Sequence, residues 1–261
     1  MLLAIDVGNT NTVFGLFAAD GDLVASFRIS TARDRMPDEW YAMLAALLGT
    51  AGLAGSEIRS TIISSVVPGV TPWLVEMCRA RFGVEADVIS GAMDVGITLD
   101  VEEPRLLGAD RIVDCVAAIS RYGAPAIIID LGTATTLDVV DRNNVYRGGV
   151  IAAGMATSLK TLATNAAQLF NVSLFLPESV VGRNTADQLR AGIVTGHLVM
   201  LEGMIARIDE EIGERATVIL TGGVAHVFAG RSLRFDVIDT DLTLDGLYLI
   251  HQRLHGSPGA S

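Results

Sequence analysis

Lysine and cysteine are both scarce in this chain of 261 residues. Lys160 is the only lysine and does not follow a glycine-rich loop, which excludes a Walker-type lysine cradle and a site of the protein-kinase type. Cys78 and Cys115 are isolated within helical patterns, so we expect two core thiols in a reducing compartment, the cytoplasm. The net charge is −11 and there is no run of lysine or arginine, which argues against nucleic acid and anionic membrane as partners.

Targeting and membrane signals are also missing from the sequence. The first residues lead directly into an apolar strand pattern, without a basic segment or a cleavage signature, so we expect no signal peptide. No apolar run approaches the length of a membrane span, and we expect no membrane-spanning segment. Half of the residues are hydrophobic, and the length is sufficient for two domains of ordinary size.

A strand-turn pattern that occurs twice is the most informative feature present. The copies lie at residues 4–13 and 128–137. In each, a buried apolar strand runs into an acid, Asp6 or Asp130, and then into a tight glycine turn with small hydroxyl or amide side chains. A repeat that covers half of the chain predicts two related domains that face one another across a cleft.

Each copy continues into a predicted hairpin. Asp20-Gly21 turns the first hairpin and Asn143-Asn144 turns the second. Asparagine and Asp-Gly tolerate the positive φ that such turns need. Each copy therefore predicts three consecutive antiparallel strands.

The chemistry of the repeated turn favours phosphate binding. Gly8 and Gly132 allow the backbone to approach a ligand closely, and consecutive backbone N–H groups in such a turn form an anion-binding concavity. The acid at the strand end can hold a cation, directly or through water. One copy alone is better explained as a hairpin whose Asp and Asn satisfy turn backbone. Two copies in register predict a site for a nucleoside triphosphate.

A second, weaker repeat relates residues 61–66 to residues 217–222, each a buried strand that ends in small residues before a predicted helix. In the second copy Gly222-Gly223 either leaves room for a flat ligand against the backbone or serves strand-to-helix packing. Isolated glycine motifs are weak signals, so the two interpretations are equally supported.

Helical periodicity and breakers predict helices at residues 37–51, 71–82, 109–122, 155–170, 185–212 and 242–254. Residues 91–107 and 171–184 are expected to be irregular, and the tail after residue 255 frayed. Thr185 and Gln188 form a predicted capping box at the start of the long helix. The apolar arc of that helix is wide enough for an interface between two copies of the chain, or for a core helix.

Four segments together resemble a known family. They are Asp6-Val7-Gly8-Asn9-Thr10-Asn11-Thr12, Gly108-Ala109-Asp110-Arg111, Asp130-Leu131-Gly132-Thr133-Ala134-Thr135 and Gly182-Arg183-Asn184-Thr185. The first and third are similar to the actin-like ATPase superfamily of acetate kinases, sugar kinases and Hsp70, and the other two make the chain resemble the type III pantothenate kinases. The resemblance implies an α/β fold of duplicated actin-like ATPase (ribonuclease H-like) domains, residues 1–122 and 123–261, with mixed sheets flanked by helices.

The resemblance also implies an activity, the transfer of the ATP γ-phosphoryl to pantothenate, which is the first step of coenzyme A synthesis. It implies a nucleotide site of Asp6, Val7, Gly8, Asn9, Thr10, Asn11, Thr12, Val13 and Thr133. It implies a pantothenate site of Gly108, Ala109, Asp110, Arg111 and Thr185, with Asp110 as the catalytic base. Asp130 would hold a monovalent cation, K⁺ or NH₄⁺, beside Mg²⁺, and the protein would be a homodimer with pantothenate at the subunit interface.

Alternatives remain at several of these residues. Asp110 alone is typical of a carboxylate that complements a helix dipole, and Arg111 of a solvated charge. Val101 stands where the family usually has a tyrosine that can line the pantothenate pocket. Two other functions are therefore kept, a non-catalytic nucleotide-binding regulator and a kinase of another small alcohol or carboxylate on the same fold.

Overall fold

The computed structural model describes residues 1–165 and 172–256. Packing divides the chain into two compact units: the first contains residues 1–97, 102–117 and 242–261, and the second contains residues 98–101 and 118–241. The predicted halves, 1–122 and 123–261, follow the sequence repeat, whereas these units follow contacts. The last helix of the chain thus belongs with the N-terminal strands.

The first unit is built on a five-stranded sheet in the order β3-β2-β1-β4-β5. The strands are β1 (Leu2–Val7), β2 (Asn11–Phe17), β3 (Leu23–Ser30), β4 (Ser60–Ser65) and β5 (Ala86–Val88). β1, β2 and β3 are antiparallel neighbours, while β4 pairs parallel with both β1 and β5. Gly21 has a φ of 98°, as predicted for the first hairpin turn.

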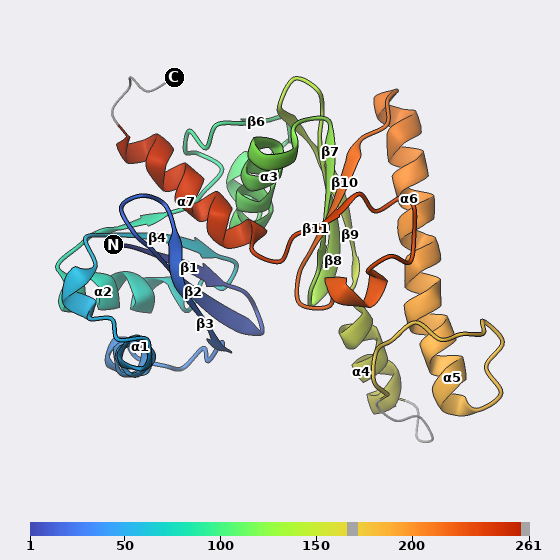
Figure 1. Cartoon of the computed structure of the whole chain (residues 1–261), viewed down its shortest axis with the longest axis horizontal. Helices are drawn as coiled ribbons and strands as arrows, with labels where there is room; N and C mark the ends of the chain where they lie inside the picture. The colour runs from blue at the N-terminus through green and yellow to red at the C-terminus, as the bar shows by residue number, and fades with distance from the viewer. Residues whose placement is uncertain (166–171, 257–261) are drawn as a thin grey trace. The chain divides into compact units, whose positions relative to one another are not determined.

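Helices cover both faces of this sheet (Figure 1). Leu3, Ile5 and Val7 point to the face that packs against α1 (Pro37–Thr50) and α2 (Thr71–Phe82). α7 (Leu242–His255) packs against β1 and β4, and its Leu244 side chain lies against the Gly15 backbone on the other face. Asp6, by alternation, shares this second face.

The second unit repeats the arrangement in a six-stranded sheet of order β11-β10-β7-β8-β9-β6. The strands are β6 (Thr98–Leu99), β7 (Ala126–Leu131), β8 (Ala134–Val140), β9 (Val145–Ala153), β10 (Thr217–Thr221) and β11 (Val237–Ile238). β7, β8 and β9 are antiparallel neighbours, and β10 pairs parallel with β7 and β11. Asn144 has a φ of 59°, which confirms the predicted turn.

The remaining helices begin where the sequence predicts them, whereas the short 3₁₀ turns were not predicted, and one of these turns, like β6, lies in the segment 91–107 that was expected to be irregular. α3 (Ala109–Tyr122) has the predicted bounds, and short 3₁₀ turns occur at η1 (Gly55–Glu57), η2 (Pro104–Leu106) and η4 (Ala225–Phe228). α4 (Met155–Asn165) begins as predicted, and the predicted residues 166–170 lie outside the described residues, as does the tail from residue 257. Cys78 and Cys115 are both buried, and burial raises the pKa of the Cys78 thiol to about 11.

The predicted long helix is continuous but irregular. α5 (Thr185–Arg190) passes through a π-helical segment (Ala191–Thr195) into α6 (Gly196–Ile212), which runs beside the six-stranded sheet in Figure 1. Most of its apolar arc is absorbed by the core against β7, β8 and β10, so the core-helix interpretation accounts for the arc. Val199 stays exposed, at 61%.

This helix also bears on the expectation that no apolar run reaches a membrane span. Residues 185–212 are long and apolar enough to cross a membrane by length and composition, so that expectation is wrong by this criterion. One such helix is weak support for a membrane, because the core helix of a globular protein passes the same test.

Candidate active site

The first acid–glycine turn joins β1 to β2 in the first unit. Asp6 is half-buried near the end of β1 and lies in register with Ser64 of β4. The Gly8 N–H donates to the Asn11 carbonyl at 2.9 Å, which closes the turn, and the side chains of residues 9–11 are exposed. A carboxylate at a strand end is thus followed by an open turn lined with uncharged donors.

Two residues that the sequence did not single out hold this turn in place. The Thr31 hydroxyl donates to the Gly8 carbonyl at 2.7 Å and lies 2.9 Å from the Thr12 hydroxyl, which is fully buried. Arg33 donates to the Asn9 side-chain oxygen at 3.1 Å. Both follow β3, and only the hairpin register brings them back to the turn, so no local motif could have found them.

The second turn, in the second unit, is held by backbone and by a hydroxyl from α4. The Gly132 N–H donates to the Ala134 carbonyl at 3.0 Å. The Thr133 carbonyl accepts from the Gly154 N–H at 3.2 Å and from the Thr157 hydroxyl at 2.6 Å. A Cβ on Gly154 would lie 2.2 Å from the Gly132 carbonyl oxygen, so no other residue fits here without movement.

Asp130 lies at the end of β7, beside the glycine that follows β10. Gly222 has a φ of 91°, and a Cβ there would lie 2.2 Å from Asp130 Oδ1 and 2.7 Å from the Leu131 carbonyl oxygen. Packing therefore explains Gly222, whereas Gly223 has open space on its side-chain side. The Asp130 carboxylate and the Leu131 backbone therefore pack closely against the Gly222 backbone.

The N-terminus of α3 carries the predicted catalytic carboxylate in the first unit. Asp110 lies in the first turn, where its carboxylate accepts the Arg111 N–H at 2.8 Å. Burial raises the pKa of Asp110 against this hydrogen bond and the Arg111 charge, which both lower it. A Cβ on Gly108 would lie 2.6 Å from Asp110 Oδ1, so the close approach that Gly108 permits is made by this carboxylate.

The predicted capping box at Thr185 is wrong. Asn184 is the N-cap of α5, and its side-chain oxygen accepts the Asp187 N–H at 2.9 Å. The Gln188 side chain instead donates to the Gly182 carbonyl at 3.2 Å, and a Cβ on Gly182 would lie 2.4 Å from the Gln188 nitrogen. Asparagine is as good a cap as threonine, and its extended backbone places it one residue earlier. Thr185 is consequently released from the cap.

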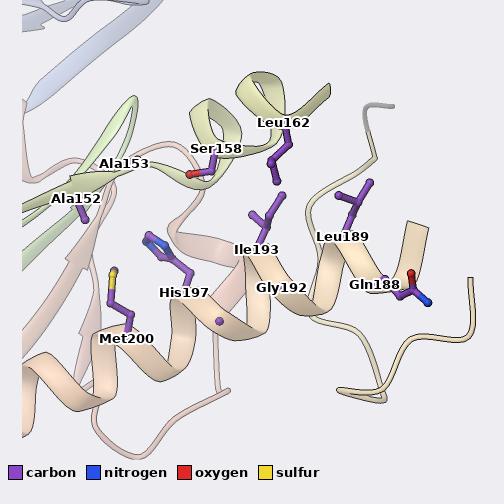
Figure 2. A pocket seen from close by; sticks show the side chains of 11 residues that line it. Ala152, Ala153, Ser158, Leu162, Gln188, Leu189, Gly192, Ile193, His197 and Met200 are labelled. Atoms are coloured by element: carbon purple, nitrogen blue, oxygen red, sulfur yellow. The ribbon is translucent and has the colours of Figure 1, made fainter. Parts of the chain in front are cut away.

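A pocket of about 570 Å³ lies in the second unit among β9, α4, α5, the π segment and α6 (Figure 2). Figure 2 shows Leu162 and Ile193 pointing toward one another across it. His197, which lines it, is buried, stacks parallel to Phe228 and lies 2.9 Å from the Thr135 hydroxyl through Nε2. Burial lowers the pKa of His197, so the ring is neutral at physiological pH.

The predicted site residues therefore fall into two groups by unit. The first unit contains the turn of residues 6–13 and the segment 108–111 at the start of α3. The second unit contains Asp130, Thr133 and Thr185. It also contains the pocket, whose lining includes Gln188, three residues after Thr185. Each unit supplies one acid at a strand end and one open glycine turn.

Two copies of an acid–glycine turn, each on the same antiparallel–parallel strand order, define the fold class as that of the actin-like ATPases and their kinase relatives. A solved structure of a putative 2-dehydro-3-deoxygalactonokinase from Sinorhizobium meliloti is similar, with a TM-score of 0.64 at 14% identity over 100% of this chain and 99% of that one. At this identity the likeness shows the fold, which confirms the predicted α/β architecture with two mixed sheets flanked by helices.

Sequence comparison is more specific. The type III pantothenate kinase family model matches residues 2–207. A type III pantothenate kinase from Thermomicrobium roseum is 44% identical over 260 residues, covering 100% of both chains. Another from Rhizorhabdus wittichii is 46% identical over 262 aligned positions, covering 99% of this chain and 100% of the relative. The chain belongs to the type III pantothenate kinase family.

Proposed function

We propose that this chain transfers the γ-phosphoryl group of Mg²⁺-ATP to the terminal hydroxyl of pantothenate, the first step of coenzyme A synthesis. The observation that carries the proposal is the 44% identity to a type III pantothenate kinase over the whole length of both chains. Asp6, Asp110 and Asp130 are all present at the predicted positions. A nucleotide-binding regulator without catalysis would be expected to have lost these acids.

The first turn would bind ATP phosphates. Within the segment from Asp6 to Val13, the exposed side chains of residues 9–11 supply amide and hydroxyl donors, with Thr31 and Arg33 holding the turn in shape. Mg²⁺ suits the carboxylate of Asp6, because Mg²⁺ prefers oxygen ligands and keeps several waters. When bound, Mg²⁺ neutralises charge on the transferring phosphoryl.

Asp110 would accept the proton of the pantothenate hydroxyl. A carboxylate is far too weak a base to ionise an alcohol beforehand, so the proton moves late, as the O–P bond forms. The buried position raises the pKa of Asp110, which strengthens it as a base. Gly108 and Ala109 let the helix start approach the substrate, and Arg111 supplies a cation for the pantothenate carboxylate, as the planar guanidinium suits oxygen anions.

Asp130 and Thr133 would serve the second half of the phosphate site. Asp130 would hold K⁺ or NH₄⁺ through its carboxylate, because oxygen ligands suit hard cations. Thr133 would contact ATP through its exposed turn, which the Gly154 and Thr157 hydrogen bonds keep in place. A monovalent cation at Asp130 would be lost when Asp130 loses its charge.

We further propose that the active form is a cytoplasmic homodimer in which Thr185 contacts pantothenate at the subunit interface. Apolar side chains are exposed on α4 and on the segment before α5: Leu162 (43%), Phe175 (47%), Val180 (70%) and Val181 (79%). Exposed apolar groups of this kind gather at interfaces between subunits. Sedimentation at micromolar concentration tests this, and a monomer with full turnover contradicts it.

A coupled ATP-consumption assay tests the reaction. The purified chain is given Mg²⁺-ATP with pantothenate, acetate, glycerol or a sugar, each with and without K⁺, and Asp110→Asn serves as the inactive control. We expect ATP to be consumed with pantothenate and with none of the other three acceptors, and we expect this consumption to require K⁺. Equal rates with another acceptor would identify a kinase of that acceptor, and no consumption with any acceptor, despite ATP binding, would identify the regulator.

A further inference from the structure

Two histidines and an aspartate converge in the first unit at a place that the phosphoryl-transfer residues do not occupy. His251 and His255 lie one turn apart on α7, so both point to the same side of the helix. Asp87 lies in the middle of β5, the edge strand of the five-stranded sheet. One ligand atom from each of the three lies within 4.8 Å of the other two.

The contacts within this cluster are uneven. His255 Nε2 lies 2.6 Å from Asp87 Oδ2, a charge-assisted hydrogen bond on a side that is open to solvent. His251 Nδ1 lies 3.5 Å from the same oxygen, and the two imidazole rings are 4.6 Å apart between centroids. One carboxylate oxygen thus faces a nitrogen of each histidine.

His251 is the residue that a simple ion pair leaves unexplained. His251 is 8% exposed, and its Nδ1 atom is buried without a hydrogen-bond partner within the described part of the chain. Burying a polar atom without a partner costs about 1–3 kcal/mol. The hydrogen bond between His255 and Asp87 at the C-terminal end of α7 explains the positions of those two side chains, but it gives the His251 Nδ1 atom no hydrogen-bond partner.

We propose that Asp87, His251 and His255 form a binding site for a divalent transition-metal ion, with Zn²⁺ as the best-suited member of the class. Imidazole nitrogens with one carboxylate are a common ligand set for such ions. Three protein ligands leave a fourth position for water. The metal would tie the end of α7 to the edge strand β5.

The distances are compatible with a tetrahedral ion. Zn–N and Zn–O bonds of about 2.0–2.2 Å place neighbouring ligand atoms about 3.4 Å apart. The His251–Asp87 separation, 3.5 Å, already matches this value. His255 would have to withdraw from 2.6 Å to about 3.4 Å, and its side chain is 54% exposed, so it has room to do so.

The surrounding charges also suit a cation. The Asp87 carboxylate places a negative charge beside both imidazoles. Arg253, on the same helix, is held by both carboxylate oxygens of Asp94 at 2.9 and 3.0 Å, so its charge is paired there.

Calorimetric titration with Zn²⁺ tests the proposal. The full chain without a histidine tag is stripped with a chelator and titrated in the absence of nucleotide. We compare the parent with His255→Ala and Asp87→Asn, and use His226→Ala, an exposed histidine outside the cluster, as the matched control. Circular dichroism confirms that each variant is folded.

We expect one Zn²⁺ per chain for the parent and for His226→Ala, and an affinity at least about tenfold weaker for the two cluster variants. Zn²⁺ should raise the melting temperature of the parent and of His226→Ala but not of the two cluster variants, Mg²⁺ should raise none of them, and Co²⁺ should give the parent the visible bands of a low-coordinate site. Absence of Zn²⁺ binding by the parent overturns the proposal. So does binding that survives unchanged in folded Asp87→Asn, because the ion would then lie elsewhere.

Discussion

The two acid–glycine hairpins share a backbone plan and differ in what their buried threonines contact. β1 and β7 have the same burial pattern along six residues, with Asp6 and Asp130 at the same half-buried position. Thr12 and Thr135, the second residues of β2 and β8, are both fully buried. The duplication has therefore preserved strand register down to single positions.

The partners of these threonines separate the two hairpins. Thr12 contacts Thr31, which in turn holds the Gly8 carbonyl, so the first hairpin stabilises its own turn. Thr135 contacts His197 of α6, which lines the pocket of the second unit. A buried hydroxyl group needs a hydrogen-bond partner. In the first unit this partner is Thr31, beside the glycine turn, and in the second it is His197, beside the pocket. If the proposed function holds, the first hairpin would be specialised for holding phosphate and the second for linking the proposed cation site to the pocket.

Asp6→Ala should have the largest effect, and should exceed that of Asp130→Ala. Loss of the Mg²⁺-orienting carboxylate removes several kcal/mol of transition-state stabilisation, which corresponds to about 10³-fold or more in turnover. Stability should change little, because Asp6 is half-buried at a strand end. The assay is kcat with saturating pantothenate, with Mg²⁺-ATP affinity measured by calorimetry. Normal turnover and unchanged Mg²⁺-ATP binding would return Asp6 to an ordinary hairpin role.

Asp110→Asn changes a residue outside both hairpins. It should lower the rate of phosphoryl transfer without lowering ATP affinity, so it serves as the reference for the two hairpin variants. Turnover should fall about 10²- to 10⁴-fold, with ATP affinity retained. Burial raises the pKa of Asp110, so its ionised form disfavours the fold as pH rises through that pKa. The variant should thus be as stable as the parent, or more stable, at neutral pH. Wild-type turnover in the folded variant would remove Asp110 from the mechanism.

The same raised pKa predicts a pH dependence. Asp110 must be ionised to accept a proton, so kcat/KM should decline as pH falls through its folded pKa, which lies above the ordinary aspartate value of about 3.9. A pH–rate profile of the parent between pH 4 and 8 shows this acidic limb. A profile that stays flat down to the ordinary aspartate pKa contradicts the assignment.

Replacement of K⁺ by Na⁺ sharpens the comparison between the two acids. We expect a loss of about tenfold, or about 1.4 kcal/mol, because K⁺ is larger than Na⁺ and is easier to strip of water at the proposed Asp130 site. Asp130→Asn should lower activity in K⁺ and reduce the difference between the salts, whereas a conservative change at Thr31 should not alter the ratio. Equal parent activity in Na⁺ free of K⁺ and NH₄⁺ refutes the requirement.

Thr135→Val and Thr12→Val give the smallest effect and the most direct test of the inferred specialisation. Each should cost about 1–3 kcal/mol of unfolding free energy, because each removes one partner of a hydrogen bond. Thr12→Val should also weaken ATP binding, while Thr135→Val should spare it. Urea unfolding and nucleotide titration measure the two quantities. Equal effects of both changes on ATP affinity would contradict the division of roles.

Local sequence was sufficient for the features that depend on local chemistry. The strands before Asp6 and Asp130, the positive φ at Asn144 and the bounds of α3 all follow from periodicity and turn residues. The capping error at Thr185 arose because Asn184, an equally good cap, precedes it. When two neighbouring residues are both good N-caps, the sequence does not show which of them has the extended backbone that precedes the helix.

The features that were missed depend on residues far apart in the sequence. Thr31 reaches Gly8 only through the register of β2 and β3, and His197 reaches Thr135 across 62 positions. The His255–Asp87 contact spans 168 positions. None has a spacing that a scan along the chain could detect. The resemblance to a kinase family implied the base role for Asp110 and narrowed the ion expected at Asp130 to a monovalent one, where the local pattern predicted only a cation.

The membership of α7 in the first unit has a consequence for the order in which the chain folds during synthesis. Leu244 of α7 lies against Gly15 of β2, and Tyr248 of α7 stacks on Phe17 of β2 at 5.0 Å between ring centroids. The N-terminal strands are therefore synthesised first but are covered on this face only when α7, the last helix, has been synthesised. All residues of the second unit precede residue 242. Domains fold as their residues emerge during synthesis. A chain that ends at residue 241 and is released from the ribosome should therefore protect the second unit from protease while leaving the N-terminal strands open to cleavage.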